Sequence, residues 1–173
     1  MVDSKGIITT KRRDNGDLNE YKAEFARDIE DGGIASAIEG ADIFLGLSKG
    51  GLLTPEMVEK MADRPLIFAL ANPDPEITPE EVLSVREDAV VATGRSDYPN
   101  QINNVLAFPF ILKAALKLKI PQITPQMIAN CATALAALVK KPTMTNIIPD
   151  AFDKRLLDAF EKAMKASVNN ASN

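Results

Sequence analysis

The stretch LIFALAN at residues 66–72 is an unbroken apolar run that stops at an asparagine, and it decides the fold. Two similar apolar runs lie at residues 42–48 and 89–94, and helix-like segments separate the three. Strands covered on both faces read as continuous apolar runs, and strands that alternate with helices build a mainly parallel sheet. The sequence therefore predicts an α/β domain with parallel strands near residues 42–48, 66–71 and 89–93.

Thr-Pro pairs mark three predicted helix starts, because a threonine hydroxyl caps the first turn and proline fits the first helical position. They are Thr54-Pro55, Thr78-Pro79 and Thr124-Pro125. Glu81, three residues after Thr78, completes a capping box. Further helices are expected at residues 105–118, with Asn104 as a suitable N-cap, and at residues 129–139 and 152–166.

Composition restricts the classes of function. The chain has 173 residues, a net charge of −4, one cysteine and no histidine. Histidine-based catalysis and His-ligated zinc are therefore excluded, and the acidic balance argues against a nucleic-acid partner. No apolar run approaches the roughly 20 residues that span a membrane, and no signal peptide is evident. We expect a cytoplasmic protein without a membrane partner. Cys131, among alanines, is expected to be buried.

The ends of the predicted strands hold the candidate site, since ligands bind beyond the carboxyl ends of an open parallel sheet. Residues 46–48 (Gly-Leu-Ser), Asn72 and Gly94 follow the three strands. The glycines are either close-approach points for a ligand or simple turns. Asn72 and the cluster at residues 101–104 carry amides that both donate and accept, so they are either ligand contacts or helix caps.

Other polar residues have plainer interpretations. Asp3 follows a truncated strand, Met1-Val2, and is either a ribose-binding carboxylate or an ordinary loop residue, since no Gly-x-Gly-x-x-Gly loop precedes it. The acidic group formed by Asp74, Glu76, Glu80 and Glu81 is not expected to bind a metal: helix electrostatics after Thr78 explain two of its members, and the spacing does not guarantee the convergent oxygens that a cation needs. Tyr21 and Lys22, being adjacent, point about 100° apart on a helix and do not form an acid–base pair. Residues 11–13 (Lys-Arg-Arg) are predicted to be a solvated, charged turn.

Taken in order, several blocks resemble the bacterial malic enzymes, and the similarity covers nearly the whole chain. The blocks are DSKGII at residues 3–8, LNEYK at 18–22, GADIFLGLS at 40–48, the segment at 52–58, FALANPDPE at 68–76, ATGRSDYPNQINNV at 92–105, and the segment at 147–153. The blocks around Asn72 and at residues 94–104 are the most specific.

The resemblance implies a partial Rossmann-like, three-layer fold with a parallel sheet and flanking helices, lacking the first strand and its Gly-rich loop. It implies an oxidoreductase that converts L-malate to pyruvate and CO2 with NAD or NADP and with Mg or Mn, whose ligands are absent from this chain. NAD is favoured, because Asp3 would repel a 2′-phosphate, although Lys5, Lys11 or Arg12 could offset that charge. By resemblance, the substrate contacts are Asn72, Asn103 and Asn104, and the cofactor contacts are Asp3, Gly46, Leu47, Ser48 and Asn72.

The family's catalytic tyrosine and lysine, its metal-binding carboxylates and its Gly-rich loop precede the strand with which this chain begins. We therefore expect residues 1–166 to be the C-terminal portion of the NAD(P)-binding domain, followed by a frayed tail at 167–173, and the chain alone to be inactive. A malolactic enzyme fragment and a non-catalytic binding or assembly module remain alternatives. Without its neighbouring strand, the chain is expected to show one of three outcomes: the segment at residues 1–8 pairs with the strand at 42–48, two chains join as a homodimer, or the missing N-terminal part fills the gap.

Overall fold

The structure, a computed structural model, describes residues 1–170 and holds a three-stranded parallel sheet. Its strands are β3 (Ile43–Gly46), β4 (Leu66–Ala69) and β5 (Val90–Thr93), in the order β3-β4-β5. The predicted strands are confirmed, each slightly shorter than expected. Gly46 pairs with Ala69, and Ala69 pairs with Thr93, so the three carboxyl ends lie level with one another.

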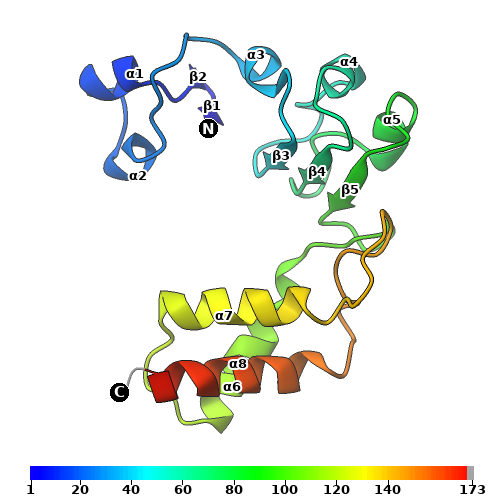
Figure 1. Ribbon diagram of the computed structural model, residues 1–173. Coiled ribbons are helices and arrows are strands. Elements are labelled where there is room, and N and C mark those ends of the chain that lie inside the picture. Colours follow the sequence, from blue (N-terminus) through cyan, green and yellow to red (C-terminus); the bar gives the residue numbers. More distant parts are fainter. Residues whose placement is uncertain (171–173) are drawn as a thin grey trace.

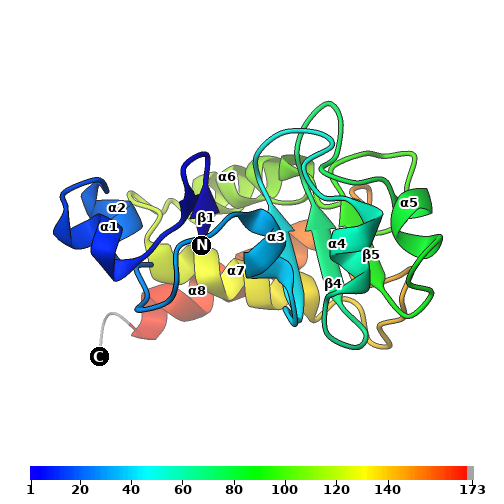
Figure 2. The same ribbon diagram turned by 90° about the horizontal axis from the view of Figure 1, so that it is seen from above.

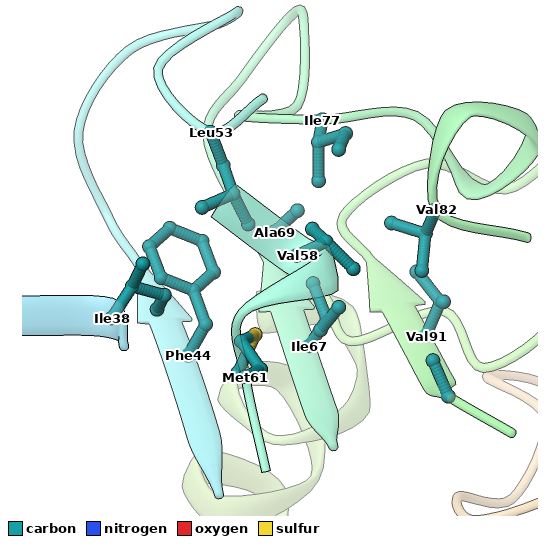
Figure 3. Close-up of a cluster of buried hydrophobic side chains, with 11 residues drawn as sticks. Ile38, Phe44, Leu53, Val58, Met61, Ile67, Ala69, Ile77, Val82 and Val91 are labelled. Carbon is teal, nitrogen blue, oxygen red and sulfur yellow. The ribbon is translucent and has the colours of Figure 1, made fainter. Parts of the chain in front are cut away.

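Three short helices pack on one face of this sheet: α3 (Ile34–Ile38), α4 (Pro55–Glu59) and α5 (Pro79–Leu83). Figure 3 shows Phe44, Ile67 and Val91 extending from the three strands into one apolar cluster with Val58 of α4. Val58 and Ile67 are completely buried. This cluster is the core that fixes the strand ends.

All three predicted threonine caps are present. The hydroxyls of Thr54, Thr78 and Thr124 accept hydrogen bonds from backbone N–H groups in the first turns of their helices. Thr78 and Glu81 form the predicted capping box, in which each side chain accepts the other residue's backbone N–H. The caps stabilise short helices that would be marginal by themselves.

The C-terminal third forms a separate helical layer, shown below the sheet in Figure 1. It consists of the 3-10 turn η1 (Asn104–Leu106) and helices α6 (Phe108–Lys117), α7 (Pro125–Ala136) and α8 (Leu156–Asn170). Its core includes Phe160 and Cys131, which is 1% exposed, as expected. Helix α8 runs to Asn170, beyond the predicted end at 166. The predicted frayed tail at 167–173 therefore lies largely in this helix, and residues 171–173 lie outside the described ones.

The N-terminal segment differs from the expected pairing. Strands β1 (Val2–Asp3) and β2 (Gly6–Ile7) form an antiparallel hairpin, followed by α1 (Thr10–Asp14) and α2 (Glu20–Ala23). The Asp3 carboxylate accepts the Lys5 N–H, and Gly6 has φ +112°, so a tight local turn forms. In Figures 1 and 2, α3 lies between this hairpin and the sheet. Of the three expected outcomes, pairing of residues 1–8 with β3 is therefore not the one observed.

Strand β3 forms one edge of the three-stranded sheet. Its side chains alternate, with Phe44 buried against the helices and Ile43 and Leu45 on the opposite face, 55% and 60% exposed. The sheet thus presents an apolar edge and face to its surroundings.

Within residues 1–170, none of the helices combines the length and apolar character needed to cross a membrane.

Candidate functional site

Three chain segments meet where the parallel strands end. They follow β3 at residues 47–53, β4 at residues 70–77 and β5 at residues 94–103. Backbone hydrogen bonds join the first two, from Gly51 N to Pro75 O (3.1 Å) and from Leu53 N to Glu76 O (3.0 Å). The third approaches the second, because a Cβ placed on Gly94 would lie 3.8 Å from Leu70 O. The predicted site residues after the strands therefore share one edge of the sheet.

Glu76 links two of these segments from inside the protein. Its side chain is completely buried and accepts hydrogen bonds from Ser48 N at 2.9 Å and Ala71 N at 3.0 Å. In the sequence, Glu76 was noted only as a member of an acidic group that was not expected to bind a metal. The preceding Pro-Asp-Pro turn, which folds the chain back toward the strand ends, was the available signal.

Gly46, predicted to line a cofactor cleft, lies directly against this carboxyl group. A Cβ on Gly46 would meet the Glu76 Cδ, so the glycine is required here by the side chain of another residue. Leu47 and Ser48, the next two predicted cofactor contacts, are exposed. The backbone of this segment is fixed from within, while its side chains face outward.

The predicted substrate residues divide into two kinds. Asn103 donates from Nδ2 to Gly94 O at 3.2 Å and accepts the Val105 N–H, so both halves of its amide are occupied. Asn103, rather than the predicted Asn104, is the N-cap, because the helical turn begins one residue earlier than expected. Asn72 and Asn104 are exposed, and among the described residues neither side-chain amide has a hydrogen-bond partner. These two amides are available to a ligand.

Asn104 lies at an apolar groove of about 590 Å³ between α6 and α7. The remaining lining residues are Ala107, Phe108, Ile111, Leu112, Ile123 and Ile128. A polar amide at the margin of an apolar surface can orient a small ligand whose other groups pack on that surface. The groove belongs to the helical layer, and Asn104 is its polar lining residue.

Asp3 is held by four donors at the N-terminal hairpin. Arg12 binds both carboxylate oxygens, at 3.0 and 3.1 Å, and Lys22 Nζ lies 2.7 Å from Oδ2. The backbone N–H of Lys5 is the fourth donor. The Arg12 hydrogen bonds, with those of Lys22 and Lys5, hold the pKa of Asp3 well below its usual range. Residues 11–13, predicted to be a charged turn, lie in α1, and Arg12 is bound to Asp3.

The segment after β5 carries a further polar group. Arg95 forms an ion pair with Asp97, and its guanidinium lies 5.6 Å from the centre of the Tyr98 ring. The Tyr98 hydroxyl donates to Glu80 of α5 at 3.0 Å, and this hydrogen bond raises the pKa of Tyr98. Glu80 is therefore bound to a tyrosine.

In residues 1–170, no three His, Cys, Asp or Glu side chains converge as a metal site.

Comparison with known proteins gives consistent matches. A family model described as "Malic enzyme, NAD binding domain" matches residues 1–159. The chain is 48% identical over 154 residues to the NADP-dependent malic enzyme of Halomonas elongata, covering 89% of this chain and 36% of the relative. It is 45% identical over 170 residues to the bifunctional malic/malolactic enzyme of Bacillus subtilis, covering 95% of this chain and 41% of the relative.

A solved structure agrees. The crystal structure of the NAD-dependent malic enzyme of Thermotoga maritima superposes with a TM-score of 0.84 at 43% identity, covering 95% of this chain and 44% of that one. The chain thus spans less than half of the length of each of these relatives.

Proposed function

Because this chain belongs to the malic enzyme family, we propose that it provides the substrate- and cofactor-positioning surface of an enzyme that oxidises and decarboxylates L-malate to pyruvate and CO2. The observation that carries the proposal is a pair of exposed amides with no hydrogen-bond partner among residues 1–170: Asn72, just after β4, and Asn104, at the start of η1. An asparagine amide can donate to a carboxylate and accept from a hydroxyl, and malate offers both groups.

The cofactor in this proposal is NAD or NADP, which supplies the hydride acceptor when it is bound. Residues 46–48 would face it at the end of β3, and Asp3 would lie toward its adenosine ribose. Leu47, 75% exposed, offers an apolar contact, and the outward Ser48 side chain offers a hydroxyl. Asn72, which follows the neighbouring strand, would lie at the junction of cofactor and substrate.

The divalent cation implied by the family does not fit the residues of this chain. Within the described part, no cluster of three suitable ligands exists, and Glu76 and Glu80 are each bound to protein groups. No step is therefore assigned to a metal here. We propose that the chain alone does not turn over malate, and that metal ligands and proton-transferring groups come from the portion of the relatives outside the matched region.

The open edge of β3 is where that portion would join. Ile43 and Leu45 are exposed beside an unpaired strand edge, and such edges pair readily with another strand. We propose that a strand from the rest of the enzyme, or a second copy of this chain, covers the edge. We also propose a cytoplasmic location, in keeping with the buried free thiol of Cys131, whose pKa is raised by burial.

A malolactic reaction, which releases lactate from malate, is the second candidate. It is favoured by the likeness to the Bacillus subtilis enzyme, whose name records both activities. Both reactions begin with the same substrate in the same place, so the geometry of Asn72 and Asn104 serves either. Product analysis separates them.

The test is a chimera in which this whole chain replaces the matching segment of the Halomonas elongata relative. We expect malate-dependent reduction of NAD or NADP in the presence of Mn, with pyruvate as the product. Lactate without net cofactor reduction would indicate the malolactic reaction. A folded chimera that produces neither would contradict both proposals.

A further inference from the structure

The buried carboxyl group of Glu76 has a role that its own backbone does not explain. Glu76 has no exposed surface, and within residues 1–170 none of the ion pairs includes it. Burying a carboxyl group without a cation is costly unless other donors satisfy it. An apolar side chain would fill the same space at lower cost, so the two hydrogen bonds are the reason for the carboxyl group.

Those hydrogen bonds hold other segments, not Glu76 itself. The backbone around Glu76 is already fixed to residues 51–53 through Pro75 O and Glu76 O. The side chain then reaches back to two N–H groups, Oε1 to Ser48 and Oε2 to Ala71. Ser48 lies just beyond β3, and Ala71 immediately precedes Asn72. One side chain therefore ties the ends of two adjacent strands.

Gly46 supports the same interpretation. The Glu76 carboxyl group occupies the space in which a side chain at Gly46 would begin, so strand end and carboxyl group are in direct contact. Ala71 is only 6% exposed, and its N–H points to the carboxylate instead of to water. A shift of this carboxyl group would be transmitted directly to the residue before Asn72.

We propose that Glu76 is a positioning residue for the reaction: through the Ala71 N–H it fixes Asn72 toward substrate, without touching the ligand itself. This inference rests on the proposed function. Displacement of a substrate-orienting group by about 1 Å can reduce turnover on the order of 100-fold. The effect of Glu76 on catalysis should therefore pass through Asn72.

The experiment is a double-mutant cycle in the chimera, with Glu76→Gln, Asn72→Ala and the double variant. Glutamine keeps the size of the side chain, but its NH2 group faces one of the two backbone donors and cannot accept from it. We expect Glu76→Gln to lower kcat/KM for malate by about 10- to 100-fold. In the Asn72→Ala background, the further loss should be under about threefold, because coupled residues are not additive. The matched control is Glu59→Gln on the exposed face of α4, expected to stay within about twofold of the wild type.

The outcomes are distinguishable. An inactive wild-type chimera that folds would refute the proposed function. If the wild-type chimera is active and Glu76→Gln has the same kcat/KM as Glu59→Gln, only the role of Glu76 is overturned. The same holds if Glu76→Gln lowers kcat/KM by the same factor with Asn72 present and with Asn72→Ala. Should Glu76→Gln fail to fold, Gly46→Ala displaces the same carboxyl group from the other side and enters the same cycle. Failure of both variants to fold would assign the hydrogen bonds to stability alone and overturn the proposal.

Discussion

Asn103 and Asn104 are neighbours in sequence with different surroundings. The Asn103 amide is bonded to Gly94 O and Val105 N, whereas Asn104 faces the groove beside Phe108 with no partner among residues 1–170. A residue whose amide is occupied stabilises the fold, and one whose amide is free can bind ligand. From the sequence, both were expected substrate contacts, and Asn104 was the expected cap.

We predict opposite effects of the two alanine substitutions in the chimera. Asn104→Ala should lower kcat/KM for malate by about 100-fold and change stability by less than about 0.5 kcal/mol. Asn103→Ala should cost about 1 kcal/mol, because a helix cap is lost. Steady-state kinetics and urea unfolding measure the two effects. A stability loss at Asn104 with unchanged kinetics would contradict the assignment.

The side chains around Asp3 change the argument for a preference between NAD and NADP. Preference for NAD was predicted from repulsion between Asp3 and a 2′-phosphate. In the structure, Lys5 N, two Arg12 nitrogens and Lys22 Nζ fill the four acceptor positions of the carboxylate, and two of these partners are cations. Lys22, with 39% of its side chain exposed, is the partner able to turn toward a phosphate.

We therefore predict that Lys22→Ala raises the KM for NADP by about tenfold, the worth of a charge-assisted hydrogen bond. The KM for NAD should stay constant or fall, since an acceptor position on Asp3 becomes free for a ribose hydroxyl. Lys60→Ala, an exposed lysine of the α4 end, is the control. Equal changes in the KM values for NAD and NADP would show that Lys22 does not face the 2′ position.

At the scale of elements, the Arg86–Asp88 ion pair follows α5, and both of its side chains form hydrogen bonds to the loop between α4 and β4. Arg86 binds both oxygens of Asp88 and donates to the carbonyls of Met61 and Ala62. Asp88 also accepts the Arg64 N–H at 2.7 Å. The Arg86 hydrogen bond, with that of Arg64, holds the pKa of Asp88 well below its ordinary value of 3.8.

The sign of the resulting pH dependence follows from that direction. A carboxyl group whose pKa is lower in the folded state stabilises the protein above its unfolded pKa and loses this effect as pH falls toward the folded one. We predict that Asp88→Asn is less stable than the wild type at pH 7, and that the difference shrinks as pH falls below about 4. Urea unfolding at several pH values measures it, with the exposed Asp42→Asn as control. A difference independent of pH would contradict the prediction.

The elements that the sequence predicted correctly are those with local causes. The Thr-Pro caps and the apolar runs of β3, β4 and β5 depend on residues within a few positions of each other. Pairing of residues 1–8 with β3, one of three expected outcomes, does not form, because the Asp3 turn and Gly6 favour a hairpin over a distant strand. Glu76 was missed because its partners, Ser48 and Ala71, become neighbours only when two strands align.

At the scale of the whole molecule, the exposed edge of β3 is the feature expected to make the isolated chain associate with other copies of itself. Ile43 and Leu45 lie more than half exposed on a strand that has a neighbour on one side only among residues 1–170. Such an edge favours pairing between chains. The same edge is where the rest of a malic enzyme would join under the proposed function.

We predict that the isolated 173-residue chain reduces neither NAD nor NADP with malate and Mn, and that its mass by light scattering exceeds 18.7 kDa. Leu45→Lys should lower that mass toward the monomer, because a charge on the edge strand opposes pairing. Leu83→Lys, at a comparably exposed position on α5, should leave it unchanged. Turnover by an 18.7 kDa monomer would reveal a base and a metal site in this chain alone.

The most direct measurement is the position of pyruvate in a crystal structure of the chimera with NADP bound. We expect its oxygens within about 2.7–3.2 Å of the side-chain amides of Asn72 and Asn104, with Asn103 still bonded to Gly94 O. The nicotinamide should lie beside the ends of β3 and β4. Pyruvate bound away from these strand ends, or in contact with neither Asn72 nor Asn104, would contradict the assignment of the site.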